Sequence, residues 1–407
     1  MKRILAAMLA ALTVFSTAGC AKPDNSTEPA APDQQVEPAP TVPQEPVLTP
    51  EEQAEQERLA AEKAREERLQ GLLDSMTLEE KVGQLFFVRC PAENAVEDIS
   101  TYHLGGYLLF GRDFKDGDNW LTKEQFLEKI QGYQDAASIP LFIGSDEEGG
   151  TVTRASRNPN LFSEPFKSPQ AIYSAGGMEA LAQDALDKSQ ALLDLGINVN
   201  FAPVCDVSTN PGDFIYDRTL SQDAETTADY ITRTVLTMGD AGEMAVLKHF
   251  PGYGNNADTH TGIAVDDRPM ETFENSDLLP FKAGIEADAP FVLVSHNIVN
   301  CMDPDLPASL SPAVHRVLRE TCGFGGIAIT DDLAMDAVQA YAKNGAVAVM
   351  ALQAGNDMII TTDYRTQIPA VIAAVQDGTL DESVIDDACL RVLRCKDTFL
   401  RIPENNP

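Results

Sequence analysis

Eight short apolar runs, each separated from the next by a longer stretch, constrain the fold of this chain more than any other feature. They are residues 85–88, 106–110, 140–144, 199–203, 244–248, 291–294, 327–330 and 358–361. Runs that are apolar on both faces are typical of buried parallel strands, and parallel strands need crossover connections, usually helices. Eight strand–helix units predict an α/β fold with a single (β/α)8 (TIM) barrel. The alternative, an open doubly wound sheet, is disfavoured because no GxGxxG motif follows the first run.

Polar side chains that can carry chemistry follow seven of these runs. They are Gly111-Arg112-Asp113, Asp146-Glu147-Glu148, Asp206, Lys248-His249, His296-Asn297, Asp331-Asp332 and Thr362-Asp363. Barrel enzymes build their active sites at the C-terminal ends of the strands. The sequence therefore predicts a site where these groups meet.

The charge of the chain excludes one large class of partners. Lys and Arg total 30 against 63 Asp and Glu, which gives a formal net charge of −33. Such a chain repels phosphates, and it has no Lys/Arg cluster that would bind them. We therefore expect no nucleic-acid partner. We also expect a monomer that uses no cofactor.

The first twenty residues are typical of a secretion signal. Lys2 and Arg3 precede an apolar stretch over residues 4–15, and Thr17-Ala18-Gly19-Cys20 offers a small-residue cleavage site. This end resembles the lipobox of bacterial lipoproteins, which implies that Cys20 is lipidated and that the protein is extracytoplasmic and anchored to the cell membrane. An ordinary signal peptide followed by a chance cysteine is the alternative. The apolar stretch is shorter than the about 20 residues that span a bilayer.

Composition divides the chain into five segments. The signal peptide covers residues 1–19, and a proline-rich linker covers 20–50, where eight of the thirty residues after Cys20 are proline. Such a segment cannot bury a core. Residues 51–70 predict a charged, exposed helix, 71–400 the barrel, and 401–407 a tail.

The segment Lys248 to Gly254, followed by Asp258-Thr259-His260, carries the most chemical information. An Asp-x-His pair supplies a carboxylate that can orient an imidazole and stabilise its protonated form, although such a pair is also common in surface turns. A metal site formed by His249, His260 and His296 beside Asp331 is disfavoured because no HExxH or similar spacing occurs. The remaining cysteines lack CxxC spacing; we favour free thiols, and disulfide pairing stays open.

Residues 76–397 resemble glycoside hydrolase family 3, specifically its β-N-acetylhexosaminidase branch. The resemblance rests on ordered motifs: Met76 to Gln84, Asp146 to Gly150 with Arg154, Phe201 to Val204 with Asp206-Val207, Asp217-Arg218, Lys248 to Gly254 with Asp258 and His260, Ser295-His296, Pro307 to Ser309, and Thr330 to Met335. The family implies retaining hydrolysis of terminal β-linked N-acetylhexosamine (GlcNAc) from glycans or peptidoglycan fragments, through a covalent glycosyl-enzyme intermediate.

The resemblance also implies roles for individual residues. The nucleophile matches Asp331, and the acid/base dyad matches His260 with Asp258. Adjacent strand residues face opposite sides, so we expect Asp332 to point away from the site. The sugar-binding set matches Asp146, Arg154, Arg218, Lys248 and His249. For the two arginines the alternative is a structural ion pair with neighbouring acids.

Three positions depart from the pattern of this branch, namely Thr151, Tyr253 and Thr259, and they leave the leaving-group preference open. The chain ends about ten residues after Lys396, which leaves no room for the second domain that supplies the acid/base glutamate in many β-glucosidases of the family. We therefore expect the barrel itself to supply the proton donor.

Other functions stay open from the sequence. A substrate-assisted hexosaminidase would use an adjacent pair such as Asp146-Glu147. A β-glucosidase-type enzyme of family 3 is one alternative. A phosphorolytic enzyme is another, since a histidine acid/base does not repel phosphate. A third is a non-catalytic, lipid-anchored sugar-binding protein.

Overall fold

The computed structural model describes residues 49–256, 264–335, 338, 340–341 and 347–403, and every structural statement refers to these residues. Their helices and strands, in chain order, are α1 (Pro50–Ser75), α2 (Leu78–Gln84), β1 (Phe87–Arg89), α3 (Ala95–Tyr102), β2 (Gly106–Leu109), β3 (Lys115–Asp116), β4 (Asn119–Trp120), α4 (Lys123–Ala136), β5 (Phe142–Ser145), α5 (Pro169–Leu193), β6 (Val199–Asn200), α6 (Ala224–Ala241), β7 (Met244–Phe250), β8 (Val265–Asp266), α7 (Met270–Thr272), α8 (Leu278–Glu286), β9 (Phe291–Val294), β10 (Ile298–Val299), α9 (Pro312–Arg316), β11 (Ile327–Thr330), α11 (Val347–Ala354), α12 (Tyr364–Gln376) and α13 (Glu382–Leu400).

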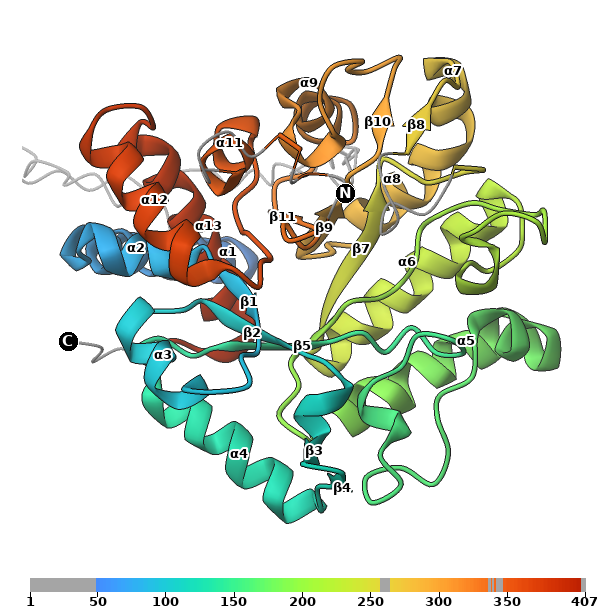
Figure 1. Ribbon diagram of the computed structural model, residues 1–407, viewed down its shortest axis with the longest axis horizontal. Coiled ribbons are helices and arrows are strands. Elements are labelled where there is room, and N and C mark those ends of the chain that lie inside the picture. Colours follow the sequence, from blue (N-terminus) through green and yellow to red (C-terminus); the bar gives the residue numbers. More distant parts are fainter. Residues whose placement is uncertain (1–48, 257–263, 336–337, 339, 342–346, 404–407) are drawn as a thin grey trace, which may run out of the picture. The chain divides into compact units, whose positions relative to one another are not determined.

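A parallel sheet of seven strands lies at the centre of the fold, in the order β1-β2-β5-β6-β7-β9-β11. Figure 1 shows these strands with helices such as α4, α5, α6 and α12 around them. Seven of the eight apolar runs correspond to these strands, and the predicted bounds of β9 and β11 match the observed ones. The prediction of an α/β fold with a parallel sheet is confirmed.

The eighth run does not form a regular strand. The sheet therefore has seven strands, where the sequence predicted eight. Residues near 358–360 make single parallel bridges to both edges of the curled sheet, Ile359 to Phe86 and Met358 to Ile329. The backbone N–H of Ile360 donates to the hydroxyl of Thr330 at 3.0 Å. Because this bond goes to a side chain, it interrupts the ladder that a regular strand would need.

Aromatic side chains fill the space enclosed by the sheet. The ring of Phe87 lies 5.9 Å from that of Phe142 and 5.3 Å from that of Phe201, between centroids. Gly144 makes room for them, since a Cβ there would meet ring atoms of Phe87 and Phe201 at 2.7 Å. The interior is therefore a packed core, and any open space must lie at the ends of the strands.

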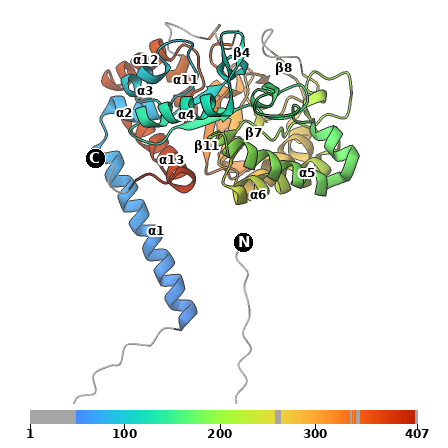
Figure 2. The same cartoon turned by 90° about the horizontal axis from the view of Figure 1, so that it is seen from below.

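The crossover helices begin and end at recognisable caps. Helix α6 begins after Asp223, whose carboxylate accepts the backbone N–H of Thr226 at 2.8 Å, and it ends at Gly242, whose φ of 90° suits glycine. Helix α6 packs against α5 and α8, and Figure 2 shows α5 beside α6. These caps and contacts fix the loops at the strand ends.

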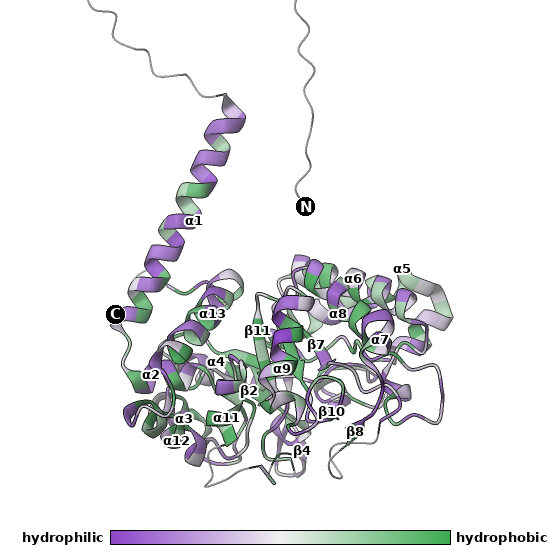
Figure 3. Cartoon of the chain, turned by 90° about the horizontal axis from the view of Figure 1, so that it is seen from above, coloured by the Kyte–Doolittle hydropathy of each residue, from purple (hydrophilic) through white to green (hydrophobic). Residues whose placement is uncertain are grey.

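Helix α1 changes character along its length. Residues 50–64 are exposed, as the composition predicts, and Figure 3 shows this part as mostly hydrophilic. Further along, Leu69 and Leu73 are buried, and Arg65 pairs with Asp397 at 2.6 Å. The expectation of an exposed helix up to residue 70 is therefore wrong for its last turns, because leucines one turn apart reach the core. No helix of the described ranges has the length and apolar character needed to cross a bilayer.

Candidate active site

A cavity of about 580 Å³ opens at the C-terminal ends of the parallel strands. Six of the predicted catalytic and sugar-binding residues line it together: Asp146, Arg154, Arg218, Lys248, His249 and Asp331. They come from loops that are far apart in the chain, and the sheet brings them to one end. The acid/base candidates Asp258 and His260, and the lipidation candidate Cys20, lie outside the described residues.

A buried ion-pair network forms one wall of the cavity. Arg218 donates to both carboxylate oxygens of Glu148, from Nε at 2.9 Å and from a terminal nitrogen at 2.7 Å, and Lys248 Nζ lies 2.6 Å from the same carboxylate. Burial acts to raise the pKa of Glu148, but Arg218 and Lys248 outweigh it and hold that pKa well below its ordinary value. The network therefore stays charged, and the two cations are held in fixed positions.

Asp146 lies between two cations at the mouth of this network. Its Oδ1 is 2.8 Å from Lys248 Nζ, and its Oδ2 is 3.6 Å from a terminal nitrogen of Arg154. Both arginines of the expected sugar-binding set thus form ion pairs and also line the cavity. A preorganised set of charged donors and acceptors of this kind is suited to binding hydroxyl groups, since charge-assisted hydrogen bonds are the stronger ones.

His249 is held in one tautomer by its two neighbours. Its Nδ1 is 2.7 Å from Asp206 Oδ2, and its Nε2 is 3.0 Å from a terminal nitrogen of Arg218. A guanidinium can only donate, so Nε2 accepts and Nδ1 carries the hydrogen that Asp206 receives. Burial, aided by the charge of Arg218, lowers the pKa of His249. We infer a neutral ring that positions Arg218 and faces the cavity.

Asp331 and Asp332 follow β11, and both line the cavity. Asp331 accepts the backbone N–H of Asp332 at 2.8 Å. The carboxylate of Asp332 accepts the backbone N–H of Ala334 at 2.9 Å and the hydroxyl of Thr362 at 3.2 Å. The expectation that only one of the pair points inward is wrong, because both residues lie beyond the last residue of the strand, where alternation no longer applies.

Glu147 is buried below the cavity and does not line it. Its carboxylate accepts the backbone N–H groups of Arg154, at 2.6 Å, and Ala155, and the hydroxyl of Ser156 at 2.9 Å. Burial raises its pKa against these hydrogen bonds. Glu147 therefore holds the loop that carries Arg154, and the adjacent Asp146-Glu147 pair cannot act together on one substrate.

Four residues contribute to this site without a role predicted for them from the sequence. Glu148 and Asp206 stand among the polar groups expected at the strand ends, and they hold Arg218, Lys248 and His249 in place. Arg89 and Phe110 line the cavity as well. A signal for Arg89 was present, because it directly follows the first apolar run, the one run without a polar residue assigned to its end.

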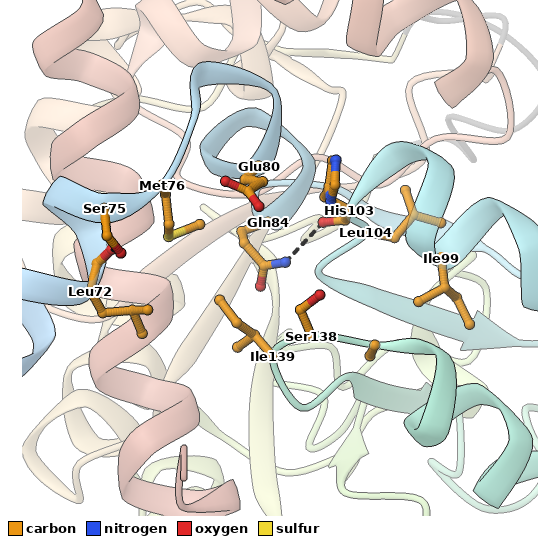
Figure 4. Close-up of a pocket in the computed structure, with 11 residues that line it drawn as sticks. Leu72, Ser75, Met76, Glu80, Gln84, Ile99, His103, Leu104, Ser138 and Ile139 are labelled. Atoms are coloured by element: carbon orange, nitrogen blue, oxygen red, sulfur yellow. Dashed lines mark hydrogen bonds between the residues drawn. The ribbon is translucent and has the colours of Figure 1, made fainter. Parts of the chain in front are cut away.

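A second cavity, of about 80 Å³, lies at the opposite ends of the strands. Figure 4 shows its lining, in which Gln84 donates to the backbone carbonyl of His103 at 2.8 Å. Gln84, Leu104 and Ile139 precede β1, β2 and β5 respectively. That end of a barrel contributes to stability, whereas catalysis takes place at the other end.

The described histidines of the metal hypothesis have other partners. His249 contacts Asp206 and Arg218, and the ring of His296 contacts the hydroxyl of Ser309 at 2.8 Å and the carbonyl of Asp332 at 3.1 Å. Within the described ranges no three His, Cys, Asp or Glu side chains gather closely enough to hold a metal ion. The six cysteines of these ranges are free thiols.

Comparison with known proteins identifies the family. Residues 77–395 match the glycosyl hydrolase family 3 N-terminal domain. The beta-hexosaminidase LpqI of Mycobacterium tuberculosis is 30% identical over 330 residues, which cover 78% of this chain and 82% of LpqI. A beta-hexosaminidase of Xanthomonas oryzae pv. oryzae is 33% identical over 295 residues, which cover 69% of this chain and 83% of that protein.

A solved structure agrees. The glycoside hydrolase family 3 beta-N-acetylglucosaminidase from Paenibacillus sp. str. FPU-7 superposes with a TM-score of 0.73 at 30% identity, over 80% of this chain and 63% of that chain. This chain thus spans less than two thirds of that protein. Fold, site position and sequence point the same way: the chain belongs to glycosyl hydrolase family 3 and is a glycosidase.

Proposed function

We propose that this protein is a retaining β-N-acetylhexosaminidase that releases terminal β-linked GlcNAc residues through a covalent glycosyl-enzyme intermediate. The observation that carries the proposal is the convergence of Asp331 with five charged or polar groups on one cavity at the strand ends. The names of the relatives, beta-hexosaminidase and beta-N-acetylglucosaminidase, support the choice of sugar.

Asp331 is the proposed nucleophile. Retaining hydrolysis needs a carboxylate that attacks the anomeric carbon. The hydrogen bond from the backbone N–H of Asp332, at 2.8 Å, orients one oxygen of Asp331. The resemblance to the family favours Asp331 over Asp332, whose oxygens accept the backbone N–H of Ala334 and the hydroxyl of Thr362.

The ion-paired groups that line the cavity are the proposed sugar-binding set. Lys248 and Arg218 each retain donor hydrogens beyond those that Glu148 and Asp146 accept, since an ammonium has three and a guanidinium five. Because Glu148 fixes both cations, they need not be ordered when substrate binds, which lowers the entropic cost of binding. Ring hydroxyls are the groups that such donors and the carboxylate of Asp146 would hold.

His260, oriented by Asp258, is the proposed acid/base. The resemblance to the family is the only support for these two roles, because both residues lie outside the described ranges. The two glutamates after Asp146 offer no better donor: Glu147 holds a loop and Glu148 is ion-paired, and both are buried. We further propose that residues 358–361 complete a (β/α)8 barrel, supported by their bridges to both edges of the sheet.

We also propose that the protein is an extracytoplasmic lipoprotein whose Cys20 carries the lipid anchor. The signal-like first nineteen residues and the proline-rich linker support this. Cys20→Ser should release active enzyme from the membrane fraction into the medium. Activity that stays in the membrane fraction of cells making this variant would overturn the anchor.

A panel of p-nitrophenyl glycosides, assayed with and without phosphate, tests the proposed activity. We expect release of p-nitrophenol from the N-acetyl-β-glucosaminide, little release from the β-glucoside or any α-anomer, and free GlcNAc in either buffer. A glycosyl phosphate as the product would make the enzyme a phosphorylase. Binding without turnover of any member would favour a sugar-binding protein.

A further inference from the structure

Four cationic side chains line the cavity, and three of them have a carboxylate partner. Lys248 and Arg218 pair with Glu148, and Arg154 lies 3.6 Å from Asp146. Arg89 is the fourth. Within the part of the chain that the structure describes, no carboxylate lies within ion-pair distance of its guanidinium, and its Nε is buried without a hydrogen-bond acceptor.

An aromatic ring holds Arg89 in place. Its guanidinium carbon lies 4.2 Å from the ring centroid of Phe110, and that of Arg154 lies 5.5 Å from the same centroid. Phe110 follows β2, and its backbone N–H donates to the carboxylate of Asp113 at 2.7 Å. Stacking on a ring restrains a guanidinium and leaves the edge with its N–H donors available. Arg89 is therefore restrained by Phe110 without being neutralised.

The strand order shows which part of a substrate can reach Arg89. Of the proposed sugar-binding groups, Asp146 and Arg154 follow β5, and Lys248 and His249 lie near the end of β7. Arg218 lies in the loop after β6, so all five belong to strands in the middle of the sheet. Arg89 ends β1, at one edge, and Asp331 follows β11, at the other edge. Both edges meet residues 358–360, so Arg89 and Asp331 flank the same side of the cavity. Because Asp331 is the proposed nucleophile, we infer that a group held by Arg89 lies near the anomeric carbon of a bound sugar.

We propose that Arg89, stacked on Phe110, binds a carboxylate carried by the aglycone, so that the enzyme prefers N-acetylglucosaminides whose leaving group is anionic. This specificity rests on the proposed function and deepens it. A planar guanidinium matches a carboxylate with two parallel N–H···O bonds, and Arg154 on the same ring adds positive potential. Neutral aglycones leave the buried Nε without an acceptor.

Two substrates of the same size test the proposal, 3-carboxyphenyl and 3-carbamoylphenyl N-acetyl-β-glucosaminide. We expect kcat/KM of the wild type to be about tenfold or more higher for the carboxylate, as charge-assisted hydrogen bonds predict. Arg89→Gln should bring the ratio of the two kcat/KM values close to one, and Arg89→Lys should retain part of it. Arg157→Gln is the matched control, because it removes an exposed arginine three residues from Arg154 that does not line the cavity.

Each outcome has a separate meaning. Failure of the wild type to hydrolyse either substrate would contradict the proposed function. Hydrolysis of both with equal kcat/KM would overturn the anion site and leave the proposed function intact. Equal losses on both substrates in Arg89→Gln would mean that Arg89 contacts the sugar itself. If the ratio of the two kcat/KM values fell equally in Arg157→Gln, the preference for the carboxylate would come from the overall charge of the protein and not from a site at Arg89.

Discussion

Glu148 and Arg218 are joined by two hydrogen bonds, at 2.9 and 2.7 Å, and the carboxylate also receives Lys248. Arg218 lines the cavity, and Glu148 is buried behind it. One carboxylate thus positions two of the groups that line the cavity. Both arms of the bidentate contact are needed to fix the plane of the guanidinium.

Glu148→Gln should damage both the site and the stability of the protein. The variant leaves two buried cations with one carboxylate fewer, and breaking a buried pair costs about 3–5 kcal/mol. We expect kcat/KM to fall by about a hundredfold, since small displacements of positioning groups have effects of this size. Urea unfolding and steady-state kinetics measure the two effects, and the exposed Glu164→Gln serves as the control. Unchanged kcat/KM would show that Arg218 and Lys248 do not bind substrate.

Asp331→Ala should abolish turnover and leave the fold intact, because the side chain at the cavity would no longer form the glycosyl-enzyme bond. Asp332→Asn is the matched comparison, and we expect it to keep measurable activity. A slow fluorinated N-acetylglucosaminide followed by mass spectrometry of peptides identifies the labelled residue. A label on Asp332 would reverse the assignment.

Much of the fold was predictable because its dominant signal is local. A run such as 291–294 is apolar on both faces, and burial on both faces is what a central parallel strand requires. The eighth run has the same composition, yet Ile360 bonds to the hydroxyl of Thr330 in place of a backbone carbonyl. This hydrogen bond depends on a residue thirty positions away, so the local sequence pattern around Ile360 cannot predict it.

The sequence predicted which residues meet at the site better than it predicted the partners that hold them. Residues such as Lys248 and Asp146 stand at strand ends, and the barrel rule alone brings them together. The partners that fix them were harder to find, because Glu148 and Asp206 act through contacts between loops. The inward position of Asp332 also escaped the pattern, since the two-residue period holds only within the strand.

Glu243 should make the free energy of unfolding fall as pH rises from 4.5 to about 7. It is buried, its Oε2 accepts the hydroxyl of Ser189 at 2.7 Å, and its Oε1 has no partner within the described ranges. Burial raises its pKa from 4.5 to about 7, against the effects of Ser189 and Lys188, while Glu147 adds to the rise. A group whose pKa is higher in the folded state binds more protons there. Its stabilising contribution is therefore complete below pH 4.5 and is lost between pH 4.5 and 7.

The matched variant for this prediction is Glu243→Gln, which keeps the shape of the protonated side chain. The free energy of unfolding of the wild type, relative to that of the variant, should fall by about 3 kcal/mol between pH 4.5 and 8. Denaturant unfolding at a series of pH values measures this difference, and other titrating groups cancel in it. A difference that does not change with pH would mean that Glu243 is not protonated in the folded protein.

The acid/base role proposed for His260 rests on the resemblance to the family. If it protonates the leaving oxygen, His260→Ala should impair a GlcNAc disaccharide, a poor leaving group, far more than an activated aryl glycoside, whose departure needs little protonation. Asp258→Asn should show a weaker version, since the imidazole keeps its place but loses its charged partner. Burst kinetics must separate glycosylation from deglycosylation, because the same residue then activates the incoming water.

Equal losses of kcat/KM on both substrates would assign His260 to binding or structure. The proton donor would then have to come from elsewhere than Glu147 or Glu148, which hydrogen bonds and ion pairs hold away from the cavity.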